Sequence, residues 1–432
     1  MKKVSFDEAS GKHIHIMALG VTLLVFLMLV SIAGEAPFAD IQNSGSNNVS
    51  NFNKFDKAIN SYEKTIELNP HDSLTRYNRA CAYSPINKMD VIEVQILSIN
   101  DFHGQLELPS SQIPMGRNNK TGAFIYSNSG GAEYLATYIN RLKSENPNTF
   151  VVSAGDSIGA SPLISAYFHD EPTIKALNIM GLEFSAVGNH ELDKGLEELI
   201  RIQNGGCHPK DGCLGNSSFE GANFHFLAAN IVNESTNATV FPAYNVTYVQ
   251  GVLIGFIGVA LRDTPAIVRP SGVKGLKFLD EAETINKYVR KLKGMGVKTI
   301  VVLIHDGGSQ SADGLYNESL NMSGPILDVV KLTDHAVDVF ITGHTHKVYN
   351  VLIDGSIVTE AYAQGNVLTD IDLVISNETH AVIEKRARNI VVSRGIPKYS
   401  GVAKLVKEYK CLVAPTADKV IGNITGKYYS GT

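Results

Sequence analysis

Histidines and acidic residues recur along this chain in short clusters whose residue types are those of metal ligands. "VFITGHTH" places two histidines after an apolar run, "ILSINDFHG" places an Asp-X-His after another, and similar clusters read "AGDS", "GNHELD" and "IHDGG". Together they supply imidazoles, carboxylates and an amide oxygen. These are too many ligands for one tetrahedral ion and suit two ions that share a bridge. Mixed nitrogen and oxygen ligands favour Zn, Mn, Co or Fe over Mg or Ca.

The segments before these clusters predict why they should meet. From Val91 onward, apolar runs alternate with helical periodicity, which predicts an α/β or layered α/β/α domain. Each cluster follows an apolar run directly, and ligands gather outside the carboxyl ends of strands in such domains. The predicted strands are 91–99, 150–154, 184–188, 224–231, 252–260, 299–304 and 337–342, and the predicted helices are 131–146, 192–203 and 280–293.

The spacing within two clusters predicts that their side chains converge. Residues at i and i+2 of an extended segment project to the same side, so Asp101 and His103 can point at one place. The same holds for His344 and His346, and Gly343 before them is expected to let the backbone turn sharply beside the ions.

Each cluster alone also has an ordinary structural interpretation. Asp-X-His occurs in surface loops, and Gly-Asp is typical of turns. Asn189 could cap a helix with Glu191 in its first turn, and His305 could be a hydrogen-bonded core histidine. The metal-site interpretation is favoured because all the clusters occur in one chain, each after a predicted strand.

The ordered set Asp-X-His, Gly-Asp, Gly-Asn-His-Glu, His and Gly-His-X-His resembles the calcineurin-like metallophosphoesterases. More narrowly, "INDFHGQLE", "AGDSIGASP" and "GNHELDKG" are similar to the branch of 5′-nucleotidases and UDP-sugar hydrolases. The resemblance covers about 91–432. It implies a catalytic domain over 91–415 with a layered α/β/β/α fold, in which two packed mixed sheets are flanked by helices.

The resemblance also implies roles for individual residues. One ion would be held by Asp101, His103, Asp156 and His346. The second would be held by Asp156 as the bridge, Asn189, His305 and His344. His190 and Asp193 match the family's catalytic dyad, and their i, i+3 spacing at the start of a predicted helix lets Asp193 stabilise a charged His190.

The implied activity is that of a metal-dependent phosphoric ester hydrolase of the 5′-nucleotidase type. It would hydrolyse nucleoside monophosphates, or UDP-sugars, by means of a metal-bound hydroxide. The alternatives on the same site are a 2′,3′-cyclic-nucleotide phosphodiesterase/3′-nucleotidase or another ester hydrolase. Residues 416–432 resemble a truncated connection to the family's C-terminal substrate-binding domain, so a non-catalytic binding protein with reduced activity is a further alternative.

Composition and charge limit the class of partner. The 432 residues are 44% hydrophobic and 19% charged, which is typical of a globular protein. The net charge of −5 shows no basic excess. It therefore argues against a nucleic-acid polymer or an anionic membrane surface and leaves a small phosphate ester as the expected partner.

The N-terminal part predicts export. Lysines precede an apolar run over 14–33, so residues 1–36 are expected to form a signal peptide or an uncleaved signal-anchor helix. Several Asn-X-Ser/Thr sequons agree with an extracellular, cell-surface or lumenal glycoprotein. After a polar linker over 37–51, residues 52–84 resemble one tetratricopeptide-like helical hairpin, which needs neighbours to bury its apolar face.

Two cysteines stand close together in "GGCHPKDGC". Pro209 and Gly212 favour a turn that brings Cys207 and Cys213 within disulfide range, which an oxidising compartment permits. The alternative is a zinc site that includes His208, but two thiols and one imidazole fall short of four ligands.

Overall fold

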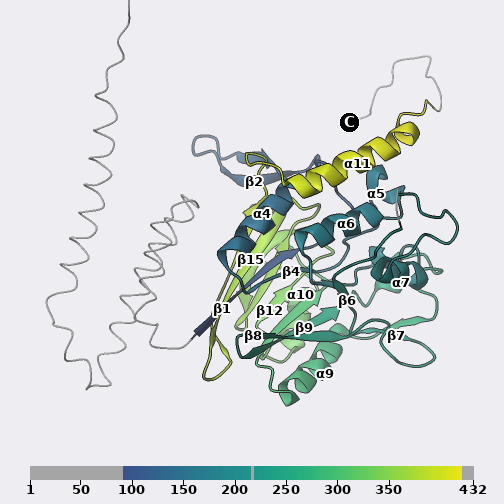
Figure 1. Cartoon of the computed structure of the whole chain (residues 1–432). Coiled ribbons are helices and arrows are strands. Elements are labelled where there is room, and N and C mark those ends of the chain that lie inside the picture. The colour runs from purple at the N-terminus through teal and green to yellow at the C-terminus, as the bar shows by residue number, and fades with distance from the viewer. Residues whose placement is uncertain (1–90, 216–217, 421–432) are drawn as a thin grey trace, which may run out of the picture. The chain divides into compact units, whose positions relative to one another are not determined.

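The computed structural model describes residues 91–215 and 218–420 (Figure 1). The predicted signal segment, linker and helical hairpin lie outside these residues. The strands are β1 (Val91–Ile99), β2 (Gln112–Arg117), β3 (Phe124–Asn128), β4 (Thr149–Ser153), β5 (Phe184–Ala186), β6 (His225–Leu227), β7 (Ile231–Asn233), β8 (Tyr244–Val249), β9 (Val252–Val259), β10 (Leu276–Phe278), β11 (Thr299–Ile304), β12 (Val339–Ile341), β13 (Val348–Ile353), β14 (Ser356–Ala361), β15 (Val367–Ser376) and β16 (Val382–Val391). The helices are α4 (Ala132–Glu145), α5 (Leu163–Ala166), α6 (Glu171–Met180), the 3₁₀ turn η2 (His190–Leu192), α7 (Leu196–Asn204), α8 (Thr264–Ile267), α9 (Glu281–Gly294), α10 (Ile326–Leu332) and α11 (Ser400–Ala417).

Two six-stranded mixed sheets form the centre of the described domain. The first has the order β16-β15-β1-β4-β5-β6, and the second has the order β13-β14-β12-β11-β9-β8. Strands β1, β4, β5 and β6 run parallel in the first sheet, as do β9, β11, β12 and β14 in the second. Strands β4 and β11 are buried along their whole length, because both faces of their sheets are covered.

Apolar side chains from the two sheets pack against each other, and helices cover the outer faces. Ile96, Val152 and Phe184 of the first sheet share one buried cluster with Phe256 and Val301 of the second. Helices α4, α6 and α11 contribute to the core on the outer face of the first sheet, whereas α9 and α10 cover the second. The predicted α/β/β/α architecture is therefore confirmed.

Two predicted elements were wrong in their limits. The run over 224–231 is not one strand, because it divides into β6 and β7. Between them the Asn230 side chain turns away to bond the backbone of Ala260. The helix predicted over 192–203 begins only at Leu196, after η2, because Gly195 has a left-handed φ of 93° that separates the two segments.

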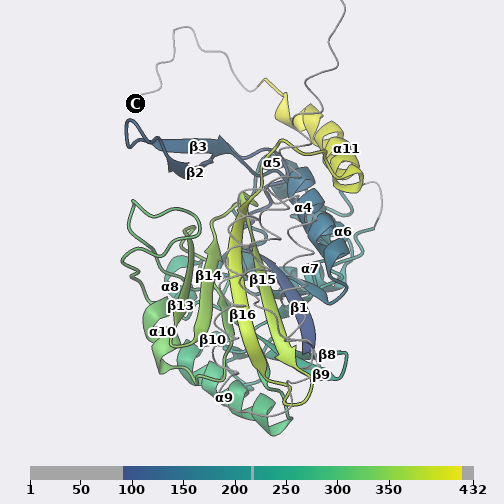
Figure 2. The same ribbon diagram turned by 90° about the vertical axis from the view of Figure 1, so that its left-hand side faces the viewer.

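Two elements extend from the sheets at the same end. Figure 2 shows the β2–β3 hairpin projecting from the body of the domain, with α11 nearby.

Helix α11 ends two residues after the predicted domain boundary at 415. Over 91–215 and 218–420, none of the helices combines the length and the apolar character that crossing a membrane requires.

Candidate metal centre

Loops after five strands bring all seven predicted ligands and the predicted dyad to one edge of the two sheets. β1, β4 and β5 belong to the first sheet, and β11 and β12 belong to the second. Because the carboxyl ends of the parallel strands meet at this edge, residues as far apart as Asp101 and His346 become neighbours.

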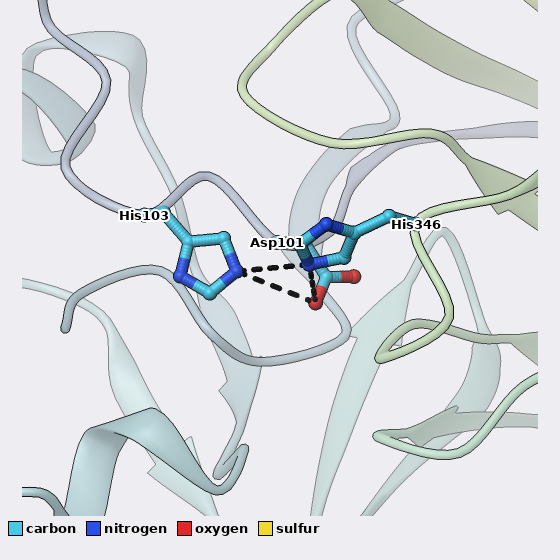
Figure 3. Close-up of side chains that lie close together, drawn as sticks. All are labelled: Asp101, His103 and His346. Atoms are coloured by element: carbon cyan, nitrogen blue, oxygen red, sulfur yellow. Dashed lines mark hydrogen bonds and ion pairs between the residues drawn. The ribbon is translucent and has the colours of Figure 1, made fainter. Parts of the chain in front are cut away.

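Asp101, His103 and His346 form the first group of ligand atoms (Figure 3). The Nε2 atoms of the two imidazoles lie 3.0 Å apart. Asp101 Oδ1 lies 3.3 Å from His346 Nε2 and 3.8 Å from His103 Nε2. Asp101 is completely buried, whereas His346 is exposed, so this group faces solvent on one side.

Asp156, His305 and His344 form the second group, together with Asn189. His305 Nε2 lies 3.1 Å from both Asp156 Oδ2 and Asn189 Oδ1. His344 Nδ1 lies 3.0 Å from the same Asn189 oxygen. The structure thus brings these four predicted ligands together.

Asp156 lies between the two groups, as expected of a bridging ligand. Its Oδ2 atom is 3.1 Å from His305 Nε2 and 3.9 Å from His103 Nε2. Burial raises the pKa of the Asp156 carboxyl, but the charges of the surrounding histidines outweigh burial and hold that pKa well below its usual range. The carboxylate is therefore ionised and available to a cation.

The histidine hydrogen bonds fit resident metal ions. The Nδ1 atom of His103 faces the Gly159 carbonyl oxygen at 3.0 Å, and that of His305 faces the Ala154 carbonyl at 2.9 Å. A carbonyl accepts only from N–H, so Nδ1 carries a proton in both rings and Nε2 is the atom left to bind a cation once the ring is neutral, the arrangement typical of metal-ligating histidines. Two carboxylates beside these Nε2 atoms complete a donor set suited to two divalent ions.

The predicted dyad lies directly beside both groups. His190 Nδ1 and Asp193 Oδ2 are 2.8 Å apart, because the 3₁₀ geometry of η2 places residues i and i+3 above one another. This hydrogen bond, more than any other influence, raises the pKa of His190 to about 9. The His190 backbone N–H also donates to Asp156 Oδ1 at 2.8 Å, so the dyad is fixed to the bridging carboxylate.

The backbone at the ligands is not extended, which corrects the expectation from i, i+2 spacing. Asp101 and His103 both have a φ of 49°, and His344 and His346 have φ values of 72° and 51°. Left-handed turns, rather than pleated strands, aim these side chains inward. Gly343 does not turn the chain with a positive φ either. It allows close approach, because a Cβ atom there would lie 2.9 Å from Asp101 Oδ2.

Three buried groups that support the ligands were missed from the sequence. The Glu191 carboxylate accepts hydrogen bonds from the backbone N–H groups of Asp156, Ser157 and Gly188 at 2.7–2.8 Å. Asn100 donates to Asp101 Oδ2 at 2.7 Å. Glu360, whose pKa burial raises, accepts hydrogen bonds from the Thr345 hydroxyl and the Lys347 N–H. The "GNHE" motif could have indicated the role of Glu191, because the motif contains it. No sequence motif indicated the contacts of Glu360.

A small pocket opens beside the dyad. Its volume is about 90 Å³, and His190, Asp193, Lys194, His169 and Glu198 are among the residues that line it. Cys207 and Cys213, the first and last residues of the segment 207–213, form a disulfide. Both thiols are consumed by that bond, so the alternative zinc site with cysteine ligands does not form.

The fold and the clustered ligands define a metallophosphoesterase-type domain. Residues 94–348 match the family of calcineurin-like phosphoesterases, and the chain belongs to that family. The prediction of a metal-dependent phosphoric ester hydrolase is thereby confirmed at the level of the family.

Two relatives of this chain are enzymes of different kinds. The chain is 34% identical over 332 residues to endonuclease YhcR of Bacillus subtilis, an alignment that covers 77% of this chain and 26% of the endonuclease. It is 26% identical over 364 residues to a snake venom 5′-nucleotidase of Gloydius brevicauda, covering 79% of this chain and 55% of the enzyme. The chain thus spans only about a quarter to a half of these relatives' lengths.

A solved structure shares the fold. The crystal structure of a 5′-nucleotidase precursor from Thermus thermophilus aligns with a TM-score of 0.57 at 20% identity. The alignment covers 76% of this chain and 61% of that one.

Proposed function

We propose that this chain hydrolyses small phosphate monoesters, with nucleoside 5′-monophosphates as the leading substrates and UDP-sugars next. The observation that carries the proposal is the juxtaposition of two ligand groups, bridged by Asp156, with the His190–Asp193 pair. The motif resemblance and the venom 5′-nucleotidase relative support a nucleotide as the ester.

The chain's own residues have distinct roles in this proposal. Asp101, His103, Asp156 and His346 would hold one divalent ion, and Asp156, Asn189, His305 and His344 would hold the other. When bound, such ions polarise a phosphoryl group and acidify a water molecule. The protonated His190 would lie beside the phosphoryl group and neutralise the charge that develops on it or on the departing oxygen, while Asp193 holds the imidazolium in place.

A second candidate is cleavage of a phosphodiester in a nucleic acid, which the endonuclease relative favours. The shared region is only 26% of the endonuclease, so the nuclease activity can belong to the part of that protein that this chain does not match. The net charge of −5 also provides little attraction for a polyanion. We therefore place a small ester first.

The same proposal places the protein outside the cytosol. The apolar N-terminal run, the sequons and the Cys207–Cys213 disulfide all agree with an oxidising compartment. The snake venom 5′-nucleotidase relative agrees as well.

The test is turnover by the full chain after loading with Mn²⁺ or Zn²⁺. AMP, UDP-glucose, 2′,3′-cAMP, an aryl phosphate and single-stranded DNA are offered separately, and released phosphate or cleaved DNA is measured. We expect AMP to give the highest kcat/KM and His190→Ala to lower kcat by about 10²–10⁴-fold, the usual contribution of an acid–base group. The matched control is His335→Ala. His335 is exposed and is not among the candidate ligands or the dyad, so this substitution should leave kcat unchanged.

Two outcomes would contradict the proposal. Preferred cleavage of DNA would assign the site to polynucleotides. Absence of turnover on every ester by metal-loaded protein would support the non-catalytic alternative.

A further inference from the structure

A second cluster of metal-ligand side chains lies apart from the candidate metal centre. His169, Glu198 and His208 present ligand atoms that lie within 4.8 Å of one another. His169 stands between α5 and α6, Glu198 is on α7, and His208 belongs to the segment 207–213, which we call the disulfide loop. Three separate parts of the chain therefore converge on one place.

One distance in this cluster is close to that between two ligands of a common ion, and another is that of a direct hydrogen bond. His169 Nε2 lies 2.8 Å from Asp211 Oδ2, and His208 Nδ1 lies 3.2 Å from the same oxygen. Zinc bonds to nitrogen and oxygen of about 2.0–2.1 Å place tetrahedral ligand atoms roughly 3.3 Å apart. The two imidazole rings stack with centroids 3.7 Å apart at 13°, which holds both rings beside Asp211, and a shared ion would require one ring to tilt toward the other.

The contact between His208 and the Asp211 carboxylate has no proton between its two atoms. The Asp211 backbone N–H donates to His208 Nδ1 at 3.2 Å, which makes that nitrogen an acceptor. The same nitrogen faces the Asp211 carboxylate, which also only accepts when ionised. Two acceptors thus lie within 3.2 Å of each other, and a cation between them would satisfy both.

Neighbouring cations limit the charge of the cluster but do not exclude an ion. Arg201 donates to both oxygens of Glu198, at 2.9 and 2.8 Å, and also pairs with Glu171 at 2.8 Å. Lys194 pairs with Asp170 at 3.1 Å. Because a carboxylate offers about four lone-pair sites, Glu198 keeps acceptor capacity after binding Arg201.

We propose that His169, His208, Glu198 and Asp211 form a further metal site, which takes a borderline divalent ion such as Zn²⁺ or Co²⁺. Two imidazoles and two carboxylates make a four-ligand set of the kind that zinc prefers. The ion would fasten the disulfide loop to α7 and to the α5–α6 turn. It would also add positive charge to the pocket that His169 and Glu198 line together with His190 and Asp193.

The test counts metal ions on the full chain. The protein is stripped with a chelator, dialysed against Zn²⁺ or Co²⁺, and its bound metal per chain is measured together with the visible absorption of Co²⁺. We expect the His169→Ala/His208→Ala double variant to bind one equivalent fewer than the unsubstituted chain and to lose one component of the Co²⁺ spectrum. His335→Ala should bind the full complement.

Two further variants separate lost ligands from lost folding. Glu198→Gln keeps a hydrogen-bond acceptor for Arg201 but weakens a ligand, and we expect at least a tenfold weaker affinity for one equivalent only. Cys207→Ser/Cys213→Ser releases the disulfide loop and should weaken the same equivalent. Equal metal content and equal spectra in the folded double variant and the unsubstituted chain would overturn the proposal. Because the readout is a difference of one equivalent, it holds whether or not any phosphate ester is hydrolysed.

Discussion

At the scale of single residues, chemistry and backbone conformation constrain the candidate ligands together. Asp101, His103, Asp156, His344 and His346 all have φ between 49° and 72°, a region where Asp and His are tolerated but β-branched residues are strained. Such conformations persist only where surrounding contacts enforce them. The enforcing contacts are hydrogen bonds such as the one that Asn100 donates to Asp101 and those that the backbone N–H groups of Asp156 and Ser157, in the loop after β4 that we call the Asp156 loop, donate to the Glu191 carboxylate.

Glu191 provides the sharpest residue-scale prediction. Glu191→Gln places an amide NH₂ group against backbone N–H donors that now bond a carboxylate oxygen at 2.7–2.8 Å. Two donors would then face each other, and we expect the free energy of unfolding to fall by about 1–3 kcal/mol. Urea unfolding followed by circular dichroism measures the change.

The matched control for this variant is Glu197→Gln. Glu197 lies on α7 and is not buried, so its substitution should change the free energy of unfolding by less than about 0.5 kcal/mol. Equal stability of Glu191→Gln and Glu197→Gln would show that the Glu191 hydrogen bonds do not hold the Asp156 loop.

At the scale of elements, strand ends are local signals, so the candidate ligands could be assigned to the ends of strands from the sequence. β1 and β11 match the predicted strands 91–99 and 299–304, so the clusters that follow them were placed correctly. A hydrophobic run of a few residues is enough to show where a buried strand begins and ends. The convergence of the clusters at one edge then follows from the parallel arrangement of the strands.

Other features depend on contacts between distant segments and had no local signal. Glu360 on β14 supports Thr345 and Lys347 only after β12 and β14 pair. His169 and His208 stack only after the disulfide loop folds back on α5 and α6. The turns at Asp101 and His344 adopt left-handed φ values that an apolar pattern does not encode.

Gly188 gives the element-scale prediction, since it joins β5 to η2. A Cβ atom at this position would overlap Asp156 Oδ1 and its backbone nitrogen. Gly188→Ala must therefore displace the Asp156 loop, and we expect weaker metal binding together with a loss of roughly 1–3 kcal/mol of stability. Calorimetric metal titration and thermal unfolding would detect these effects.

Gly294→Ala is the corresponding control at the end of α9. Nothing lies within 4 Å of an added Cβ there, so stability should stay the same or rise slightly. Unchanged metal affinity in Gly188→Ala would mean that the loop after β4 can move without disturbing the ligands.

At the scale of the whole molecule, each proposed ion takes ligands from both sheets. Asp101 and His103 follow β1 of the first sheet, whereas His346 follows β12 of the second. Asp156 follows β4 of the first sheet, whereas His305 follows β11 of the second. Metal binding should therefore stabilise the packing of the sheets as well as the loops.

Removing metal tests this relation. An ion present at about 100 times its Kd adds about 2.7 kcal/mol to the stability of the folded state. We therefore expect EDTA to lower the Tm of the full chain by roughly 5 °C, and Zn²⁺ or Mn²⁺ to restore it. Differential scanning calorimetry provides the measurement, and an identical Tm with and without EDTA would show that the loops hold no ion.

The shared ligands have a mechanical consequence. The interface between the sheets is apolar, and apolar contacts are non-directional, so they resist separation more than sliding. Ions with ligands from both sheets would prevent one sheet from sliding against the other. A load applied along the strands should then meet its greatest resistance at the carboxyl edge, and the opposite edge should shear first.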